Sequence, residues 1–150
     1  MIKQPNSSMC FVCGRDNSIG LHLHFFQDEN DCVFAEFTPR AEHQGFPGVM
    51  HGGLVTALLD EVIGRTAIAK NFWCMTARLN VRIKKPIPID APVKIKGEVV
   101  NLHGRLLDGR GEIRLADGSL AAEAQGTFLK IPESQMIEYQ RALQWWRVDE

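Results

Sequence analysis

The sequence has no excess of charge of either sign and no long apolar run. Its 17 Lys and Arg residues nearly balance 18 Asp and Glu residues, so the formal net charge is −1. This balance provides no global attraction to nucleic acid or to acidic membranes. No apolar run approaches the roughly 20 residues of a membrane-spanning helix. We therefore expect neither nucleic acid nor a membrane as a partner.

The sequence also lacks internal repeats, linkers and low-complexity tracts. Its 150 residues therefore predict a single domain. A domain of this length buries roughly 68–70% of the surface of its unfolded chain, which is enough for a core. The segment from Met1 to Met9 has neither the basic nor the apolar region of a signal peptide. A cytoplasmic location is the expectation.

A second cysteine pair is missing as well. Among four cysteines, only Cys10 and Cys13 form a CxxC pair, whereas structural zinc sites commonly use two such pairs. No strand–helix pattern of the thioredoxin type surrounds the pair. His22 and His24 lie nearby in the sequence, but a solvated or hydrogen-bonded histidine is more common than a metal ligand. We interpret the pair as packed thiols beside a turn at Gly14 and expect no metal site.

The most informative stretch of the sequence is residues 47–64. A turn of Gly and Pro residues leads into His51, Gly52 and Gly53, and a run of helix-forming residues follows. The start of a helix exposes amides that have no partner within the helix, and these amides attract developing negative charge. Glycine at this place lets another molecule approach the backbone closely. The stretch therefore predicts a site that holds an oxyanion.

The predicted helix has one apolar arc and one acidic residue well away from it. At roughly 100° per residue, Asp60 lies off the arc, whereas Glu61 and Arg65 lie four residues apart and suit a solvated ion pair. A solvated polar face is the ordinary interpretation of Asp60, but the small residues around it would let a ligand approach its carboxylate. The arc, which we expect to pack against a sheet, consists of Leu54, Val55, Leu58, Leu59, Val62 and Ile63.

The rest of the chain predicts an antiparallel sheet and a C-terminal helix. Residues 75–84 alternate between apolar and polar with period two, as in a strand with one buried face. Gly97 marks a predicted bulge or kink, and Gly109 and Gly111 indicate a close approach or a bend. With one long central helix the pattern is α+β. A sheet with one covered face and a long edge strand often pairs with a second copy, so we predict at least a homodimer. The other predicted elements are strands at residues 21–26, 32–37, 92–100, 106–115 and 120–129 and an amphipathic helix at 132–147.

This order of elements, with a Pro-Gly-x-x-His-Gly-Gly motif at residues 47–53 and Asp60 nine residues after the His, resembles the hot-dog fold thioesterases. Within that fold the sequence is most similar to the PaaI-type group of the 4-hydroxybenzoyl-CoA thioesterase-like superfamily. Residues 10–14, 75–81 and 85–88 carry further parts of the resemblance. It implies one hot-dog domain over residues 1–150, with its core at about 10–130. It also implies an antiparallel sheet wrapped around one long helix, an acyl-CoA substrate, and a homodimer or homotetramer.

The resemblance also implies roles for individual residues. Asp60 matches the helix carboxylate that acts as a general base on water or as a nucleophile. Gly52 matches the glycine whose amide polarises the thioester carbonyl, with Gly53 beside it. Thr76 matches a Ser or Thr that supports the water or the carboxylate from the partner subunit. His51 matches the His of the same turn, which holds the loop and lines the site.

The resemblance also implies residues that position the substrate. Many relatives carry an Asn about six residues before that His, where this chain has Gly45, so we assign the neighbouring Gln44 to its role. A positive rim would receive the phosphates of CoA. The candidates for this rim are Arg78, Arg82, Lys84, Lys85, Arg105, Arg110 and Arg114.

Thioester hydrolysis needs a hydrogen-bond donor for the developing oxyanion and a deprotonated attacking group. A preorganised donor is worth roughly 3–4 kcal/mol, and a general base contributes about 10²–10⁴-fold. The thiolate of CoA leaves readily, so neither a strong acid nor a cofactor is expected. Two alternatives stay open: a hot-dog dehydratase or hydratase that pairs His43 with Asp60, and a non-catalytic acyl-CoA binding protein.

Overall fold

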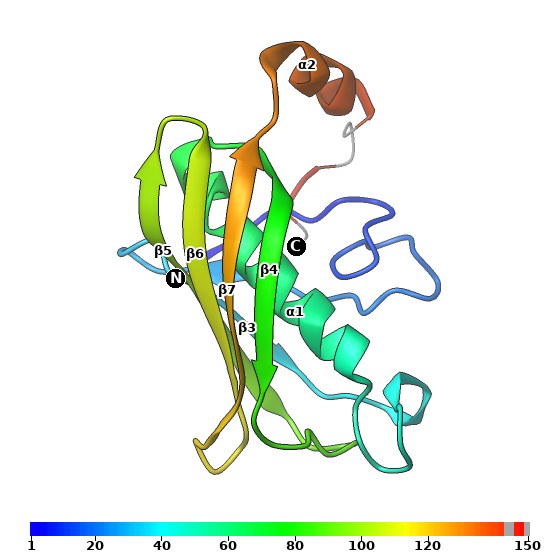
Figure 1. The fold of residues 1–150 in the computed structure, drawn as a ribbon. Helices are drawn as coiled ribbons and strands as arrows, with labels where there is room; N and C mark the ends of the chain where they lie inside the picture. The colour runs from blue at the N-terminus through cyan, green and yellow to red at the C-terminus, as the bar shows by residue number, and fades with distance from the viewer. Residues whose placement is uncertain (143–145, 149–150) are drawn as a thin grey trace.

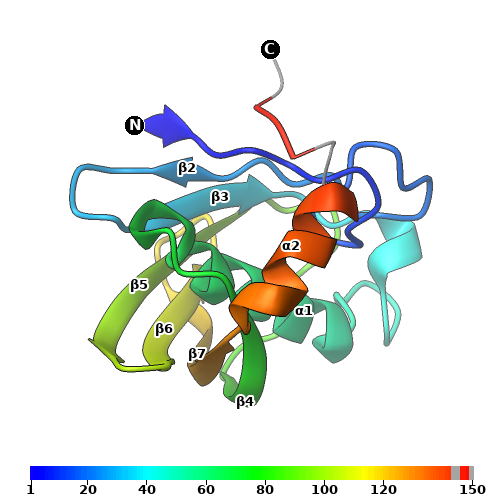
Figure 2. The ribbon, with the colours of Figure 1, turned by 90° about the horizontal axis from the view of Figure 1, so that it is seen from above.

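The computed structural model describes residues 1–142 and 146–148. Seven strands form one antiparallel sheet in the order β1-β2-β3-β5-β6-β7-β4, and the sheet curls around the long helix α1 (Figure 1 and Figure 2). The expected α+β architecture, an antiparallel sheet around one long central helix, is confirmed. The strands are β1 Ile2–Lys3, β2 Phe26–Gln27, β3 Val33–Phe37, β4 Cys74–Ile83, β5 Val93–His103, β6 Leu106–Arg114 and β7 Leu120–Lys130. The helices are α1 Gly52–Arg65, α2 Glu133–Ala142 and the short 3-10 helices η1 Ala41–His43 and η2 Ile68–Lys70.

Helix α1 buries the apolar arc that the sequence predicts, except that Leu54 is only half-buried. The buried members join one core with residues of β3, β5, β6 and β7. Burying a side chain of this kind stabilises the fold by roughly 1.5–3 kcal/mol. The arc therefore fixes which face of α1 meets the sheet and, with it, the direction in which Asp60 points. The buried members are Val55, Leu58, Leu59, Val62 and Ile63.

Two glycines set how closely α1 approaches the sheet. A Cβ on Gly97 of β5 would lie 2.5 Å from a backbone oxygen of α1, and a Cβ on Gly109 of β6 would lie 2.5 Å from the Ile63 side chain. A larger residue at either position would push the helix off the sheet. The close approach predicted at Gly109 is confirmed. The bulge predicted at Gly97 is wrong, because the register shift lies between Val99 and Asn101.

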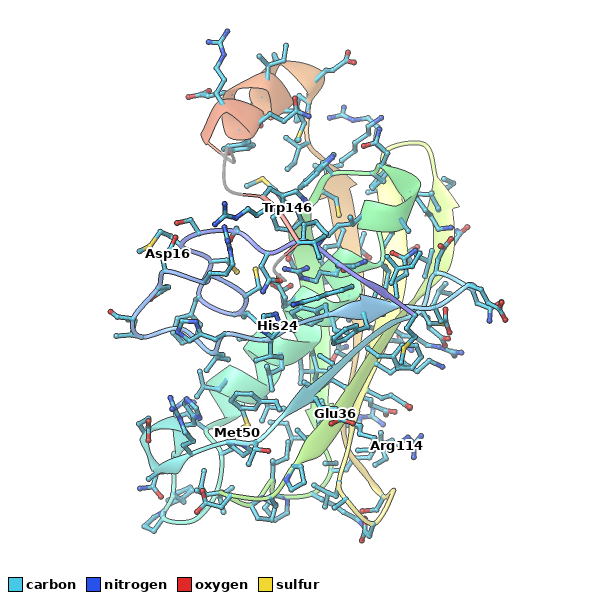
Figure 3. All side chains as sticks on the ribbon, turned by 180° about the vertical axis from the view of Figure 1, so that it is seen from behind. Asp16, His24, Glu36, Met50, Arg114 and Trp146 are labelled. Carbon is cyan, nitrogen blue, oxygen red and sulfur yellow. The ribbon has the colours of Figure 1, made fainter. Side chains whose placement is uncertain are left out.

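The segment predicted as a strand at residues 21–26 is a strand only at its end, where β2 pairs with β3. Leu21 and Leu23 are buried, as the alternation predicts. His22 between them has a φ of 54°, and the leucine amides donate to carbonyls at residues 11–12 of the N-terminal loop. Figure 3 shows this loop, which carries Asp16, and the following segment with His24. Local alternation thus predicts the burial correctly, but the hydrogen-bonding partner is a loop and not a strand.

Strand β4 forms an open edge of the sheet, since β7 is its only neighbour among the described residues. The alternation predicts that Met75 and Ile83 lie on a buried face, but their side chains are 53% and 48% exposed. Leu79 and Val81, on the same face as Ile83, are half-buried. The bulge between Thr76 and Arg78 places Met75 on the opposite face, where it pairs with the exposed Leu129. The prediction of one buried face is therefore wrong at Met75, because the bulge reverses the alternation. It is also wrong at Ile83, because the sheet ends at this strand and no described residue buries this side chain. An apolar edge strand is a ready template for pairing with another chain.

The C-terminal helix differs from the prediction at its far end. Helix α2 is described up to Ala142, and Leu143 and Trp145, which belong to the predicted helix, lie outside the described residues. Arg147 forms a β-bridge with Asn6 and is not helical, because its backbone pairs with the N-terminal segment. Among the described residues, no helix is long and apolar enough to cross a membrane.

Candidate active site

The turn before α1 leaves one amide without a partner. His51 is the N-cap residue, and its Nδ1 accepts a hydrogen bond of 2.9 Å from the Gly53 amide. The amides of Leu54 and Val55 both donate to the His51 carbonyl. Within residues 1–142 and 146–148, the Gly52 amide makes no hydrogen bond. Gly52 thus presents a free donor at the positive end of the helix dipole, where an oxyanion is stabilised.

Gly53 and His51 therefore have different roles from Gly52. The Gly53 amide is occupied by His51, so it does not provide the second donor that the resemblance places beside Gly52. Because Nδ1 of His51 accepts, a neutral ring carries its proton on Nε2. The expectation that His51 holds the turn agrees with this contact.

Asp60 and Thr76 meet where α1 faces β4. The Thr76 hydroxyl donates to Asp60 Oδ1 at 2.6 Å. Burial raises the pKa of the half-buried Asp60 carboxyl, the Thr76 hydrogen bond opposes this shift, and the charge of Glu61 adds to it. A carboxylate with a raised pKa is a better base than an ordinary surface Asp.

The resemblance assigns Thr76 to the carboxylate or water of a partner subunit, but the observed hydrogen bond lies within one chain. The reason is geometric, because β4 packs against α1 of its own chain and turns Thr76 toward Asp60. The two elements come together with Thr76 sixteen residues after Asp60 in the sequence. The carboxylate and its hydroxyl partner are therefore assembled without a second copy.

The free amide and the carboxylate lie far apart along α1. Gly52 and Asp60 are eight residues apart, which corresponds to a rise of roughly 12 Å along the helix axis. An amide that binds a carbonyl oxygen at ~2.9 Å lies only ~7 Å from an atom attacking that carbonyl carbon. Within one chain, the Gly52 amide and the Asp60 carboxylate are therefore too far apart to act directly on the same thioester carbonyl.

Gln44 and His43 stabilise the loop that precedes the helix. Gln44 Oε1 accepts a hydrogen bond of 2.9 Å from the Gly48 amide, which closes the turn between them. His43 is buried, and its Nδ1 accepts from the Arg40 amide at 2.9 Å. Burial and the positive charge of Arg40 lower the pKa of the His43 ring. Both side chains thus have structural contacts that the sequence did not predict.

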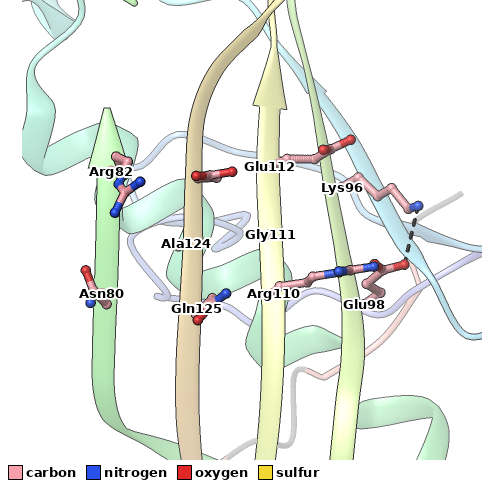
Figure 4. A pocket seen from close by; sticks show the side chains of 10 residues that line it. Asn80, Arg82, Lys96, Glu98, Arg110, Gly111, Glu112, Ala124 and Gln125 are labelled. Carbon is pink, nitrogen blue, oxygen red and sulfur yellow. Dashed lines mark hydrogen bonds and ion pairs between the residues drawn. The ribbon is translucent and has the colours of Figure 1, made fainter. Parts of the chain in front are cut away.

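In two cavities among the described residues, the lining includes none of Gly52, Asp60 and Thr76. The larger, about 950 Å³, is mostly apolar and is lined by residues of β2, β3 and the adjoining loops, His43 among them. The smaller, about 520 Å³, is a polar groove across the outer face of β4, β7, β6 and β5 (Figure 4). Because His43 lines a cavity without Asp60, the structure gives no support to the pair that a dehydratase would need.

The basic residues assigned to CoA phosphates fall into two groups. Lys84, Arg110 and Arg114 form ion pairs with carboxylates of neighbouring strands or of their own strand. Arg78 is exposed on β4, directly after a bulge between Thr76 and Arg78, and forms no ion pair with any described residue. Arg78 is therefore available to an anionic ligand, on the face of β4 opposite to Thr76.

Sequence reasoning missed two neighbours of the site. Burial and the negative charge of Asp60 raise the pKa of the Cys74 thiol to about 11. A Cβ on Gly52 would lie 3.4 Å from Cδ1 of Ile83. Cys74 stands two residues before Thr76 on β4, and this period-two spacing could have placed both on one face.

Comparison with known proteins shows the family of this chain. The family model of the thioesterase superfamily matches residues 47–122, just over half of the chain. Acyl-coenzyme A thioesterase THEM4 of Rattus norvegicus is 34% identical over 131 residues, which are 86% of this chain and 56% of that protein. The chain spans about half the length of the curated relatives it matches.

Solved structures give the same result for the fold. The thioesterase superfamily protein RHA08564 superposes with a TM-score of 0.76 at 30% identity, covering 80% of this chain and 62% of that one. The PaaI protein of E. coli superposes with a TM-score of 0.70 at 13% identity, covering 75% of this chain and 81% of that one. The chain belongs to the thioesterase superfamily and has the hot-dog fold.

Proposed function

We propose that this protein is an acyl-CoA thioesterase, which hydrolyses an acyl-CoA thioester to the free acid and CoA. One observation carries the proposal: a half-buried carboxylate, Asp60, is held by the Thr76 hydroxyl on a helix whose first residue, Gly52, offers an unpaired amide. The name of the THEM4 relative supports the substrate class. The proposal needs no metal or cofactor for the hydrolytic step.

The Gly52 amide stabilises the transition state in this reaction. Negative charge develops on the thioester oxygen as the carbonyl carbon is attacked, and the amide donates a hydrogen bond to that oxygen. Removing one oxyanion donor of this kind costs about 10²–10³-fold in kcat. The helix dipole contributes in the same direction.

Asp60 activates the attacking group. Its Oδ1 is occupied by Thr76, so Oδ2 is free to take a proton from water or to attack the carbonyl carbon itself. The CoA thiolate then leaves without a strong acid. When Asp60 itself attacks, water hydrolyses the resulting anhydride, which releases the acid and restores the carboxylate. His51 and Gln44 hold the loop that presents Gly52, and Arg78 supplies positive charge for the phosphates of CoA.

We further propose that the active protein is a homodimer in which Gly52 of one protomer acts with Asp60 and Thr76 of the other. The exposed apolar edge of β4, with Met75 and Ile83 on its surface, supports pairing of two copies along this strand. The ~12 Å rise between Gly52 and Asp60 supports a shared site. A tetramer is an extension of the same proposal. All four cysteines are free thiols, as a reducing compartment favours, and the cytoplasm remains the predicted location.

Hydrolysis is tested with a panel of acyl-CoA substrates and a thiol reagent that detects free CoA. The parent protein is expected to release thiol from at least one acyl class, and the Asp60→Asn variant is expected not to. Tight binding without release of thiol would indicate a binding protein instead. Formation of double-bond absorbance from 3-hydroxyacyl thioesters would indicate a dehydratase.

The shared site is tested by mixing two inactive chains. Asp60→Asn chains keep the Gly52 amide, and Gly52→Pro chains keep Asp60. In a symmetric dimer, random exchange of equal amounts gives about one quarter of the parent activity when each site uses both protomers. Activity that stays at the level of the separate variants would show that each site uses residues of one protomer.

A further inference from the structure

Three side chains with metal-binding atoms meet where the N-terminal loop contacts α1. Cys10 and Cys13 belong to the loop and Glu61 to the helix, and one ligand atom from each lies within 4.8 Å of the others. Cys10 Sγ is 3.8 Å from Glu61 Oε2. A tetrahedral zinc ion with a sulfur ligand at ~2.3 Å and an oxygen ligand at ~2.1 Å holds these atoms ~3.6 Å apart. The observed spacing thus needs only a small adjustment to hold one ion.

We propose that Cys10, Cys13 and Glu61 bind one Zn²⁺ ion, with a solvent molecule as the fourth ligand. Two thiolates select a soft or borderline cation over Mg²⁺ or Ca²⁺. Cysteine sulfur and carboxylate oxygen are both ordinary zinc ligands. Cys13 is buried, whereas Cys10 and Glu61 are only partly buried, so solvent reaches the remaining position.

The backbone around the two cysteines holds their sulfur atoms in place. The Cys13 amide donates to Cys10 Sγ at 3.4 Å, and the Ser7 hydroxyl lies 3.7 Å from Cys13 Sγ. The Gly14 amide donates to the Cys10 carbonyl at 2.7 Å, and a Cβ on Gly14 would lie 2.3 Å from that oxygen. Only glycine fits this turn, which brings both sulfurs toward α1. Contacts of this kind orient metal ligands.

The cluster carries no net charge when a divalent cation is bound. Arg65, whose side chain is 3% exposed, pairs with Glu61 Oε1 at 2.9 Å. Metal-bound cysteines are thiolates, so the two positive charges of Zn²⁺ cancel those of Cys10 and Cys13. The charge of Arg65 cancels that of Glu61. The bound ion would therefore leave no uncompensated charge in a place where burying one is unfavourable.

A second Cys–Glu pair shows what distinguishes this cluster. Cys32 Sγ lies 3.8 Å from Glu98 Oε2, the same separation as between Cys10 and Glu61. Among the described residues, no other metal-binding side chain completes a group with Cys32 and Glu98. The chain thus contains a matched control in which thiol and carboxylate are present but the second cysteine is not.

The test is metal binding by the full chain. The reduced protein is stripped with a chelator and titrated with Co²⁺, whose thiolate charge-transfer absorption reports cysteine ligands, and Zn²⁺ then displaces the cobalt. We expect one ion per chain. Cys10→Ser and Cys13→Ser should weaken binding by at least ~10–100-fold, the loss typical of disturbing even the outer contacts of a metal site. Cys32→Ser and Glu98→Gln should bind as the parent does.

Glu61→Gln tests the third ligand and is expected to bind cobalt at least ~10-fold more weakly. Circular dichroism checks its folding, since Arg65 loses its partner, and the two cysteine variants decide the matter if this variant does not fold. Absence of cobalt–thiolate absorption in the parent overturns the proposal. So do cysteine variants that bind as tightly as Cys32→Ser, or a Glu61→Gln variant that binds as the parent does. None of these outcomes depends on acyl-CoA hydrolysis, in which Cys10 and Cys13 take no part.

Discussion

Asp60 and Glu61 are neighbours on α1, yet they lie in different surroundings. Asp60 accepts a hydrogen bond from the neutral Thr76 hydroxyl beside the open edge of the sheet. Glu61 pairs with the buried cation of Arg65 beneath the N-terminal loop. Burial raises the pKa of both carboxyls, and Arg65 opposes the shift only at Glu61. A carboxylate with a neutral donor keeps its charge available to a substrate, whereas one with a buried cation serves the structure.

The largest effect expected from this comparison is on catalysis at Asp60. Asp60→Asn keeps the shape of the side chain but removes the base, so kcat should fall by about 10²–10⁴-fold. The melting temperature should stay close to that of the parent, because Asp60 has no charged partner within the part of the chain that the structure describes. Steady-state hydrolysis with thiol detection and thermal unfolding are the two measurements. Parent-like turnover would exclude Asp60 from the mechanism.

For Glu61, we expect a large loss of stability and little change in kcat. Glu61→Gln leaves the Arg65 cation buried without its partner, a change that typically costs roughly 3–5 kcal/mol of folding free energy. Chemical denaturation in the presence of a chelator measures this loss apart from any effect of metal. The kcat of the folded fraction should remain near that of the parent. A large fall in kcat at unchanged stability would reverse the roles of the two carboxylates.

The Gly52 amide can be removed with little damage to the helix. Gly52 is the first residue of α1, a position that proline favours, and His51 before it has the extended ψ of 132° that proline requires. Gly52→Pro should lower kcat by about 10²–10³-fold through loss of the oxyanion donor. Gly52→Ala is the control, because it keeps the amide and its Cβ meets Ile83 at an ordinary 3.4 Å. Equal activity of the two variants would show that the amide is not the donor.

The smallest expected effect is on the pH dependence of kcat/KM. The raised pKa of Asp60 means that kcat/KM should fall as the pH drops through a value above the usual range for Asp, because the base becomes protonated. The Thr76 hydrogen bond lowers this pKa, so Thr76→Val should move the acidic limb of the profile to higher pH. Thr76→Ser keeps a hydroxyl and should leave the limb in place. A limb that moves equally in both variants would point to another titrating group.

Local patterns in the sequence predicted most of the elements. The apolar arc of α1 and the period-two alternation of β4 depend on residues a few positions apart, and both elements are observed. The edge position of β4 was not predicted, because strand order depends on contacts between distant segments. The loop partner of residues 21–23 was missed for the same reason.

The candidate site also combines local features that the sequence predicts with contacts that it does not. The His-Gly-Gly turn and Asp60 stand out in the sequence because a glycine-rich helix start and an off-arc acid are local features. The sequence does not show that His51 occupies the Gly53 amide or that Gln44 binds the Gly48 amide. These contacts follow from backbone angles in the folded loop. Glu61 lies far from Cys10 and Cys13 in the sequence, so the cysteine pair alone did not predict a metal site.

The sequence by itself determined a long amphipathic helix that begins at a glycine pair, an antiparallel sheet to cover it, and an acid placed off the apolar face. Each of these follows from side-chain periodicity and backbone preference within one element. Only the tertiary structure decided which amide stays free, which carboxylate meets a hydroxyl and which meets a cation, and which strand is left at the edge. These outcomes depend on side chains that folding brings together from distant positions. The spacing of these residues in the sequence does not predict their contacts.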